Sequence, residues 1–196
     1  MQQLAQAIQG GGLNLGHGIL KVDHILNHQI DPGLMRAIGQ EMARRFRSAP
    51  VDRILTCEVS GIAPALATGL LLNVPVVYAR KHKPITMSGP VFLETAPSHT
   101  RGGEVTLMVA AEFLHAGEHV LIIDDFLASG LTTLAMLRMV VSARAAVAGV
   151  GVVIEKSFEK GRACLSSSGF ADVQVEALAV ITSMQDGQIV LADQQP

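Results

Sequence analysis

Residues 120–133 constrain the fold of this 196-residue chain more than any other segment. They read Val-Leu-Ile-Ile-Asp-Asp-Phe-Leu-Ala-Ser-Gly-Leu-Thr-Thr: an apolar run, two adjacent carboxylates, a loop of small residues and the start of a helical pattern. The apolar run predicts a buried strand of a helix-covered parallel sheet, ending at Asp124 and Asp125. Ligands bind beyond the carboxyl ends of such strands, so we expect this loop to lie at a functional site.

The rest of the chain alternates between helical and strand-like patterns. This order predicts an α/β fold with a central, mostly parallel sheet and flanking helices. The expected helices are 2–9, 32–47 (with Asp31 as N-cap), 64–72 and 132–146, and the expected strands are 53–58, 74–79, 119–124 and 149–155. Residues 83–117, rich in Pro, Gly, Ser and Thr, predict a long excursion that we interpret as a two-stranded flap.

Composition excludes several classes of protein. The chain is 49% hydrophobic and 16% charged with a net charge of −2, so it lacks the basic surface of a protein that binds nucleic acid. Cys57 and Cys164 form no zinc or redox motif, and no segment has the roughly 20 uninterrupted apolar residues of a membrane span. We therefore expect a cytoplasmic protein with no membrane partner and no metal site built from its own side chains.

The loop after the two aspartates has the chemistry of an anion site. Small residues at 128–132 let backbone N–H groups approach an anion, and the N-terminus of the following helix favours negative charge. Asp124 and Asp125 suit sugar hydroxyls or a divalent cation better than a phosphate. An Asp-Asp pair alone is more often a loop cap, but the whole segment favours a site that binds a phosphorylated sugar.

This segment resembles the 5-phosphoribosyl-1-diphosphate (PRPP) signature of type I phosphoribosyltransferases. Further blocks resemble the bacterial xanthine phosphoribosyltransferases and together cover nearly the whole chain; they are 20–32, 60–64, 79–83 and 153–158. The resemblance implies one phosphoribosyltransferase domain over 1–196. Its expected parts are a hood from about 1–35 and 156–196, a core from about 36–155 and a flexible flap from about 83–117.

The resemblance also implies an activity. The expected reaction is purine salvage, in which the 5-phosphoribosyl group of PRPP passes to N9 of xanthine to give XMP and pyrophosphate. Mg²⁺ is expected to arrive with PRPP, and the protein is expected to be a homodimer. The alternatives are an enzyme for guanine, hypoxanthine or adenine, a PRPP-sensing regulatory protein of the same fold, and a nucleotide-binding module without chemistry.

Site residues follow from the same resemblance. Asp124 and Asp125 are expected to hold the ribose hydroxyls, and the 5′-phosphate cradle is expected to be Ala128, Ser129, Gly130, Leu131 and Thr132. The expected pyrophosphate site consists of Ser60, Gly61, Arg80, Lys81 and Lys83. The role of the turn at 58–61 is expected to depend on the backbone freedom that Gly61 supplies. An ordinary turn at 58–61 and a solvated basic loop at 80–83 are the alternatives. The expected xanthine site consists of Leu20, Asn27 and Lys156.

The residue types of the expected base site match a dioxopurine. Its carbonyl oxygens need donors, and both the Asn27 carboxamide and the Lys156 ammonium donate hydrogen bonds. Phe158 is expected either to stack on the purine or, more commonly for such a residue, to lie in the core. Ala128 stands where hypoxanthine-guanine relatives carry an Asp as candidate general base, so no residue is assigned that role.

Overall fold

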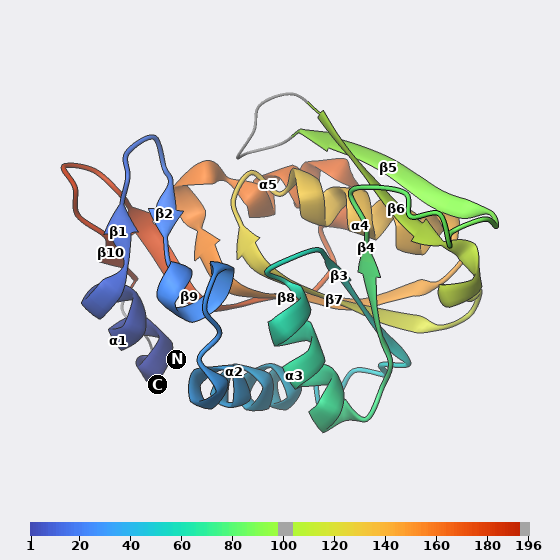
Figure 1. The fold of residues 1–196 in the computed structure, drawn as a ribbon, viewed down its shortest axis with the longest axis horizontal. Coiled ribbons are helices and arrows are strands. Elements are labelled where there is room, and N and C mark those ends of the chain that lie inside the picture. Colours follow the sequence, from blue (N-terminus) through green and yellow to red (C-terminus); the bar gives the residue numbers. More distant parts are fainter. Residues whose placement is uncertain (98–103, 193–196) are drawn as a thin grey trace.

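The computed structural model of the chain describes residues 1–97 and 104–192. Its centre is a six-stranded sheet in the order β10-β9-β8-β7-β3-β4 (Figure 1). Five of these strands run parallel and β10 is antiparallel, which confirms the predicted sheet. The strands are β3 (Arg53–Cys57), β4 (Val76–Ala79), β7 (His119–Leu127), β8 (Ala146–Lys156), β9 (Val175–Ser183) and β10 (Val190–Leu191).

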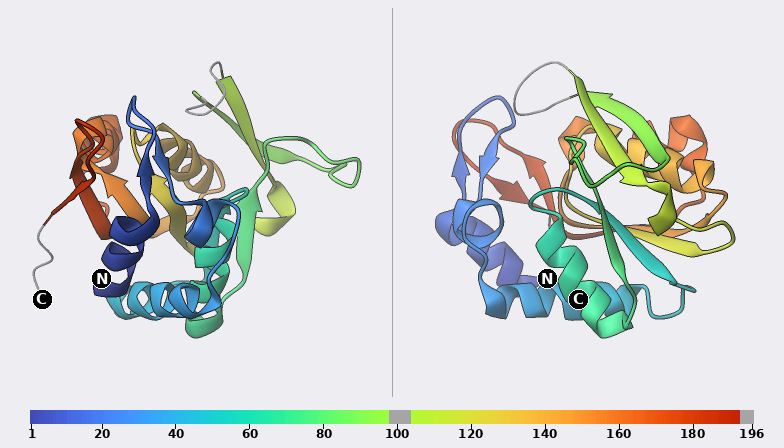
Figure 2. Two further views of the ribbon diagram at one scale, coloured as in Figure 1. Left: turned by 60° about the vertical axis from the view of Figure 1, so that its left-hand side comes forward. Right: turned by 45° about the vertical axis from the view of Figure 1, so that its right-hand side comes forward.

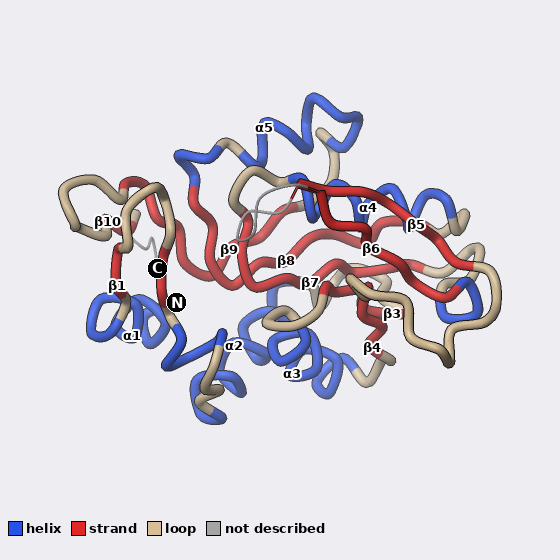
Figure 3. The backbone as a smooth tube through the Cα atoms, turned by 45° about the horizontal axis from the view of Figure 1, so that its top comes forward, coloured by secondary structure: helices blue, strands red, loops and turns tan. Residues whose placement is uncertain are grey.

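Helices cover both faces of the sheet. Figure 3 shows α1, α2 and α3 on one side and α4 and α5 on the other. The helices are α1 (Gln2–Gly11), α2 (Pro32–Arg45), α3 (Ile62–Leu72), α4 (Leu131–Ser142) and α5 (Gly161–Leu165). Short π-helical segments lie at Asp23–Asn27 and Ser166–Phe170, and 3₁₀ segments at Ala111–Phe113 and Ser157–Glu159. The side chain of Asp31 accepts a hydrogen bond from the Leu34 N–H at 2.7 Å, which confirms the predicted N-cap of α2.

Two hydrophobic cores follow from the alternation of side chains along the central strand. Leu121 and Ile123 of β7 belong to the core beneath α2 and α3, and Val120 and Ile122 belong to the core beneath α4. Successive residues of a strand point to opposite faces, so one apolar run supplies both cores. The apolar character of this strand therefore has a direct structural cause.

Several predicted element ends are wrong by a few residues. β7 continues past the two aspartates to Leu127, so Asp124 and Asp125 lie within the strand and do not terminate it. α4 ends at Ser142, earlier than the predicted residue 146. Arg144 adopts a left-handed conformation with φ of 57°, which stops the helix, and β8 begins at Ala146.

The excursion at 83–117 contains the two predicted strands, β5 (Val91–Pro97) and β6 (Glu104–Ala110), paired antiparallel. Residues 98–103 of the predicted flap lie outside the described residues. The hairpin is attached to the body, since Ala96, Leu107 and Val109 are buried in the core beneath α4. Arg80 and Met108 also exchange two backbone hydrogen bonds.

The two terminal parts of the chain meet at one end of the sheet (Figure 2). The hairpin of β1 (Leu13–Asn14) and β2 (Leu20–Lys21) lies beside the turn between β9 and β10. The side-chain amide of Asn14 donates to the carbonyls of Met184 and Gln188, each at 3.0 Å. Residues 193–196, which the prediction assigned to the hood, lie outside the described residues.

Candidate active site

A pocket of about 310 Å³ opens at the carboxyl ends of β3, β7 and β8. It contains every predicted site residue except Gly61, Arg80 and Lys83. It is lined by His17, Gly18, Ile19, Leu20, Asn27, Cys57, Glu58, Ser60, Lys81, Asp124, Asp125, Phe126, Ala128, Ser129, Gly130, Leu131, Thr132, Thr133, Lys156 and Glu159. The site therefore combines the end of the sheet with the first β-hairpin and the segment after β8.

The two aspartates occupy different environments. Asp124 is 4% exposed, and one of its carboxylate oxygens accepts the Asp125 N–H at 3.0 Å. Asp125 is partly exposed and accepts the Phe126 N–H at 2.9 Å. Burial raises the pKa of Asp124 well above its ordinary value, and the negative charge of Asp125 raises it further. Sugar hydroxyls or a cation at this position would stabilise the ionised pair.

The loop between β7 and α4 forms a tight turn. Gly130 has a φ of 84° and caps α4, which begins at Leu131. This left-handed conformation is one that glycine adopts without strain. The backbone N–H groups at the start of α4 and the hydroxyl of Thr132 then lie at one edge of the pocket. Such a helix N-terminus is a ready site for a phosphate group.

The turn after β3 lies opposite this loop. Ser60 lines the pocket, whereas Gly61 is buried behind it. The sequence predicts that Gly61 supplies backbone freedom, and that reason is wrong, because its φ of −69° is ordinary. The requirement for glycine is steric: a Cβ there would collide with the Thr56 hydroxyl oxygen and lie 2.7 Å from Asp124 Oδ1.

Of the basic residues at 80–83, after β4, only Lys81 lines the pocket. Its backbone N–H donates to Glu58 Oε1 at 2.6 Å. Arg80 does not line this pocket: its Nε lies 3.7 Å from Oε2 of Glu58, which does, and Arg80 lines a second pocket along β4. Lys83 is exposed and lines neither pocket. Neighbouring side chains of an extended segment alternate in direction, which separates Arg80 from Lys81.

The predicted base site forms the other end of the pocket. Lys156 donates a hydrogen bond to the Gly18 carbonyl at 2.6 Å, and its Nζ lies 5.3 Å from the centre of the Phe126 ring. Leu20 is 6% exposed and Asn27 ends the π-helical segment Asp23–Asn27. Phe158 is not in the core, since it is 37% exposed, and it does not line the pocket.

Sequence reasoning missed several lining residues. Phe126 follows the two aspartates directly, and the error in the end of β7 concealed its position in the pocket. No sequence motif marks Glu159 as a site residue, because its position depends on the 3₁₀ turn after β8. Its carboxylate lies 3.4 Å from Lys156 Nζ. Cys57 lines the pocket from β3, and burial, followed by the charge of Asp124, raises the pKa of its thiol to about 12.

Two further findings concern metals and membranes. Within residues 1–97 and 104–192, no group of three or more His, Cys, Asp or Glu side chains is arranged to hold a metal ion. In the same described ranges, no helix has both the length and the apolar character needed to cross a membrane.

Comparisons with known proteins give a consistent result. Residues 23–165 match the family model described as a phosphoribosyl transferase domain. The chain is 48% identical over 193 residues to a xanthine phosphoribosyltransferase of Deinococcus deserti, covering 98% of both chains. It is 46% identical to a xanthine phosphoribosyltransferase of Stutzerimonas stutzeri, covering 98% of this chain and 100% of the relative.

Solved structures share the fold at lower identity. An adenine phosphoribosyltransferase of Trypanosoma brucei, in complex with AMP, pyrophosphate and ribose-5-phosphate, has a TM-score of 0.76 at 22% identity. The match covers 90% of this chain and 78% of that one. An adenine phosphoribosyltransferase of Rhodothermus marinus has a TM-score of 0.74 at 21% identity, over 92% of this chain and 100% of that one.

Proposed function

The chain belongs to the phosphoribosyltransferase family, and from this premise we propose that it is a purine salvage enzyme acting on xanthine. It transfers the 5-phosphoribosyl group of PRPP to N9 of xanthine and releases XMP and pyrophosphate. The observation that carries this proposal is the single pocket in which an acidic pair, a phosphate-binding loop and a pair of donors for a purine lie together. The full-length relatives named as xanthine enzymes favour xanthine among the purines.

The acidic pair and the loop bind the phosphorylated sugar. Asp124 and Asp125 accept hydrogen bonds from the ribose hydroxyls, and residues 128–132 surround the 5′-phosphate with backbone N–H groups and hydroxyls. The partial positive charge of the α4 N-terminus adds to this attraction. The sugar is thereby held at both ends, which fixes the position of its C1 atom.

The opposite side of the pocket receives the pyrophosphate. Ser60 and the backbone around Gly61 supply donors, and Lys81 supplies a positive charge from the segment after β4. Neutralising the leaving group in this way favours cleavage of the bond between C1 and the pyrophosphate oxygen. Arg80 and Lys83 do not line this pocket, and we assign them to a neighbouring subunit's site.

The assignment of Arg80 and Lys83 to a neighbouring subunit requires an oligomer, and we propose a homodimer. β4 is an outer strand of the sheet, and the second pocket along it exposes Tyr78 at 41% and Phe113 at 50%. An exposed apolar surface with arginine at its centre is typical of a subunit interface. Sedimentation velocity tests this part: a species of twice the monomer mass supports it, and a monomer at micromolar concentration overturns it.

The base end of the pocket selects a dioxopurine. Lys156 and Asn27 donate to carbonyl oxygens of xanthine, while Leu20 and Phe126 provide apolar surface for the ring. Adenine lacks those carbonyls, so its binding would cover these donors without pairing them, and a site of this kind discriminates strongly against such an analogue. Ala128 offers no proton acceptor, so the purine proton leaves without an assigned protein base.

The protein accelerates the reaction mainly by positioning. The bond between N9 and C1 forms as the bond between C1 and pyrophosphate breaks, through a transition state with oxocarbenium character. Holding both reactants in one pocket and excluding water favours transfer over hydrolysis of PRPP.

The residues of this site are suited to bind Mg²⁺ together with PRPP. The donor set consists of oxygens, and the carboxylates of Asp124 and Asp125 match the one or two that Mg²⁺ usually takes together with substrate phosphates. Burial and the neighbouring charge of Asp125, which together raise the pKa of Asp124, are a further reason to expect a cation here. When bound, Mg²⁺ spreads the negative charge of the leaving pyrophosphate.

We place the enzyme in the cytoplasm, where purine salvage takes place.

Pyrophosphate release tests the proposal directly. The purified protein is supplied with PRPP and Mg²⁺ and, in separate reactions, with xanthine, guanine, hypoxanthine or adenine. Release led by xanthine supports the proposal, and release led by another purine replaces xanthine as the substrate. Binding of PRPP without release for any purine would instead favour a regulatory protein of the same fold.

A further inference from the structure

The 5′-phosphate loop is backed by the first residue of α5. Gly130, in the loop, and Gly161, at the start of α5, face each other: a Cβ at Gly130 would lie 2.8 Å from the Gly161 oxygen. Conversely, a Cβ at Gly161 would lie 2.5 Å from the Ala128 oxygen and 2.9 Å from the Leu127 side chain. The two backbones are therefore in direct contact, and the position of α5 determines how far the loop can retreat from the pocket.

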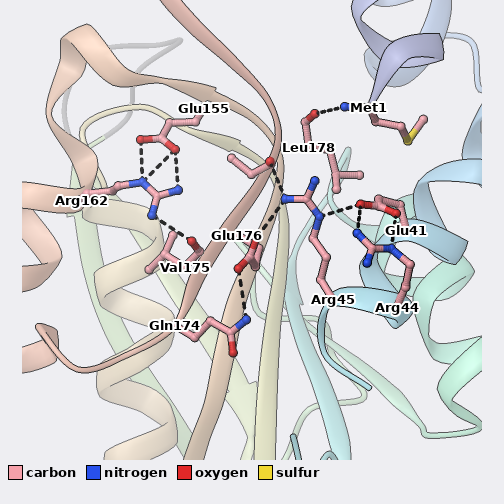
Figure 4. Close-up of polar contacts among 11 residues, drawn as sticks. Met1, Glu41, Arg44, Arg45, Glu155, Arg162, Gln174, Val175, Glu176 and Leu178 are labelled. Carbon is pink, nitrogen blue, oxygen red and sulfur yellow. Dashed lines mark hydrogen bonds and ion pairs between the residues drawn. The ribbon is translucent and has the colours of Figure 1, made fainter. Parts of the chain in front are cut away.

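An ion pair fixes α5 to the sheet. Arg162 follows Gly161 directly, and its Nε lies 2.9 Å from both carboxylate oxygens of Glu155 (Figure 4). A second guanidinium nitrogen lies 2.8 Å from Glu155 Oε2, and a third donates to the Val175 carbonyl at 2.8 Å. Glu155 is only 5% exposed, so this partner offsets the cost of burying its carboxylate. The guanidinium thus connects α5 to both β8 and β9.

The same stretch of β8 also serves the base site. Glu155 and Lys156 are successive residues, and successive side chains of a strand leave it on opposite faces. Lys156 lines the pocket while Glu155 turns toward α5. The mechanism above gives no role to Glu155 or Arg162, although Glu155 is next to Lys156 in the chain and Arg162 is next to Gly161.

We propose that the Glu155–Arg162 pair is a positioning device for the 5′-phosphate loop, acting through the contact of Gly161 with Ala128 and Gly130. This inference rests on the proposed function, because it takes residues 128–132 as the phosphate cradle. Arg162 is a positioning residue: it touches no substrate, and it sets the distance of the loop from the phosphate.

The chain offers a chemically matched control on the other face of the sheet. Arg45 of α2 binds Glu176 Oε2 at 2.9 Å and the Ala177 carbonyl at 3.0 Å, so it also joins a helix to β9 through a carboxylate and a backbone oxygen (Figure 4). These contacts join α2 to β9 and involve no residue of the loop at 128–132. Lysine at either position keeps the charge and loses the planar fork.

The test compares Arg162→Lys with Arg45→Lys by steady-state kinetics and calorimetry. Arg162→Lys is expected to raise the KM for PRPP about tenfold and to leave the KM for xanthine nearly unchanged, because a displaced loop affects only the phosphate. Calorimetric titration with ribose 5-phosphate should show a similar loss of affinity, and titration with pyrophosphate should show none. Arg45→Lys should change none of these values.

A second variant keeps the inference testable if Arg162→Lys folds poorly. Gly161→Ala leaves the ion pair in place and pushes on the Ala128 carbonyl, so it should reproduce the selective loss for PRPP and ribose 5-phosphate. Wild-type affinity for ribose 5-phosphate in both variants would overturn the inference, as would an equal effect of Arg45→Lys. Absence of turnover by the unmodified protein would count against the proposed function, while the ribose 5-phosphate titrations would still decide the role of Arg162.

Discussion

Replacing Gly61 with alanine tests whether steric contact fixes the turn beneath Asp124. The added Cβ would collide with the Thr56 hydroxyl oxygen, lie 2.7 Å from Asp124 Oδ1 and lie 3.0 Å from the Cys57 carbonyl. All three neighbours belong to buried residues of β3 and β7. The Thr56 and Asp124 side chains would have to rotate away, and the Cys57 carbonyl could withdraw only together with β3.

The expected cost follows from this overlap. Inserting a methyl group into a packed interior lowers the free energy of unfolding by about 1–3 kcal/mol. Backbone strain adds nothing, because the φ of Gly61 is ordinary at −69°. Since Asp124 is among the displaced groups, we also expect the rate of pyrophosphate release to fall by about a hundredfold, the cost of a misplacement of about 1 Å.

Urea unfolding followed by far-UV circular dichroism measures the first quantity, and the pyrophosphate assay measures the second. Gly10→Ala is the matched control, because its Cβ would meet nothing within 4 Å and lies on α1. That variant should be as active as the wild type and as stable or slightly more so. A Gly61→Ala protein with wild-type stability and activity would refute the steric argument.

Three other perturbations test the electrostatics of the fold. Because burial raises the pKa of Asp124, the stability of the wild type relative to Asp124→Asn should fall as pH rises above 3.8, the ordinary pKa. Parallel stability curves of the two proteins from urea unfolding would contradict this. Hydrogen bonds from Arg44 and Arg45 lower the pKa of Glu41 to about 2. Glu41→Gln should therefore lower the free energy of unfolding by about 0.5–1 kcal/mol at neutral pH, and this difference should shrink as pH falls from 4.5 toward 2. A difference that stays constant with pH would contradict the assignment. The Cys57 thiol, with a pKa raised to about 12, should resist an aromatic disulfide reagent in the native protein, while Cys164 reacts. Rapid labelling of a Cys164→Ser variant, in which Cys57 is the remaining thiol, would contradict this.

Much of the fold and of the site could be predicted because the relevant signals are local. The apolar run at 119–127, the small loop after it and the N-cap at Asp31 act over a few residues, and each produced the expected element. The pocket brings together residues far apart in sequence, such as Asn27 and Lys156, and these were assigned through the family resemblance.

The errors arise where tertiary structure decides the outcome. An arginine at a φ of 57° ends α4, and no sequence rule marks Arg144 for that conformation. β9 depends on its pairing with β8, and the 3₁₀ turn that carries Glu159 follows β8 directly; no local pattern in the sequence predicted either. The separation of Arg80 from Lys81 depends on the hydrogen bonds that orient the segment after β4.

The most direct test of the central claim is the identification of the nucleotide formed from PRPP and xanthine, by chromatography, in the wild type and in Lys156→Ala. Lys21→Ala is the control, since Lys21 is an exposed lysine of the same end of the molecule that pairs with Asp23. The account predicts XMP from the wild type and from the control. For Lys156→Ala it predicts a loss of at least about a hundredfold in kcat/KM, because the ammonium that donates to a carbonyl oxygen of xanthine is removed. Unchanged XMP formation by Lys156→Ala, or no XMP from the wild type, would contradict it.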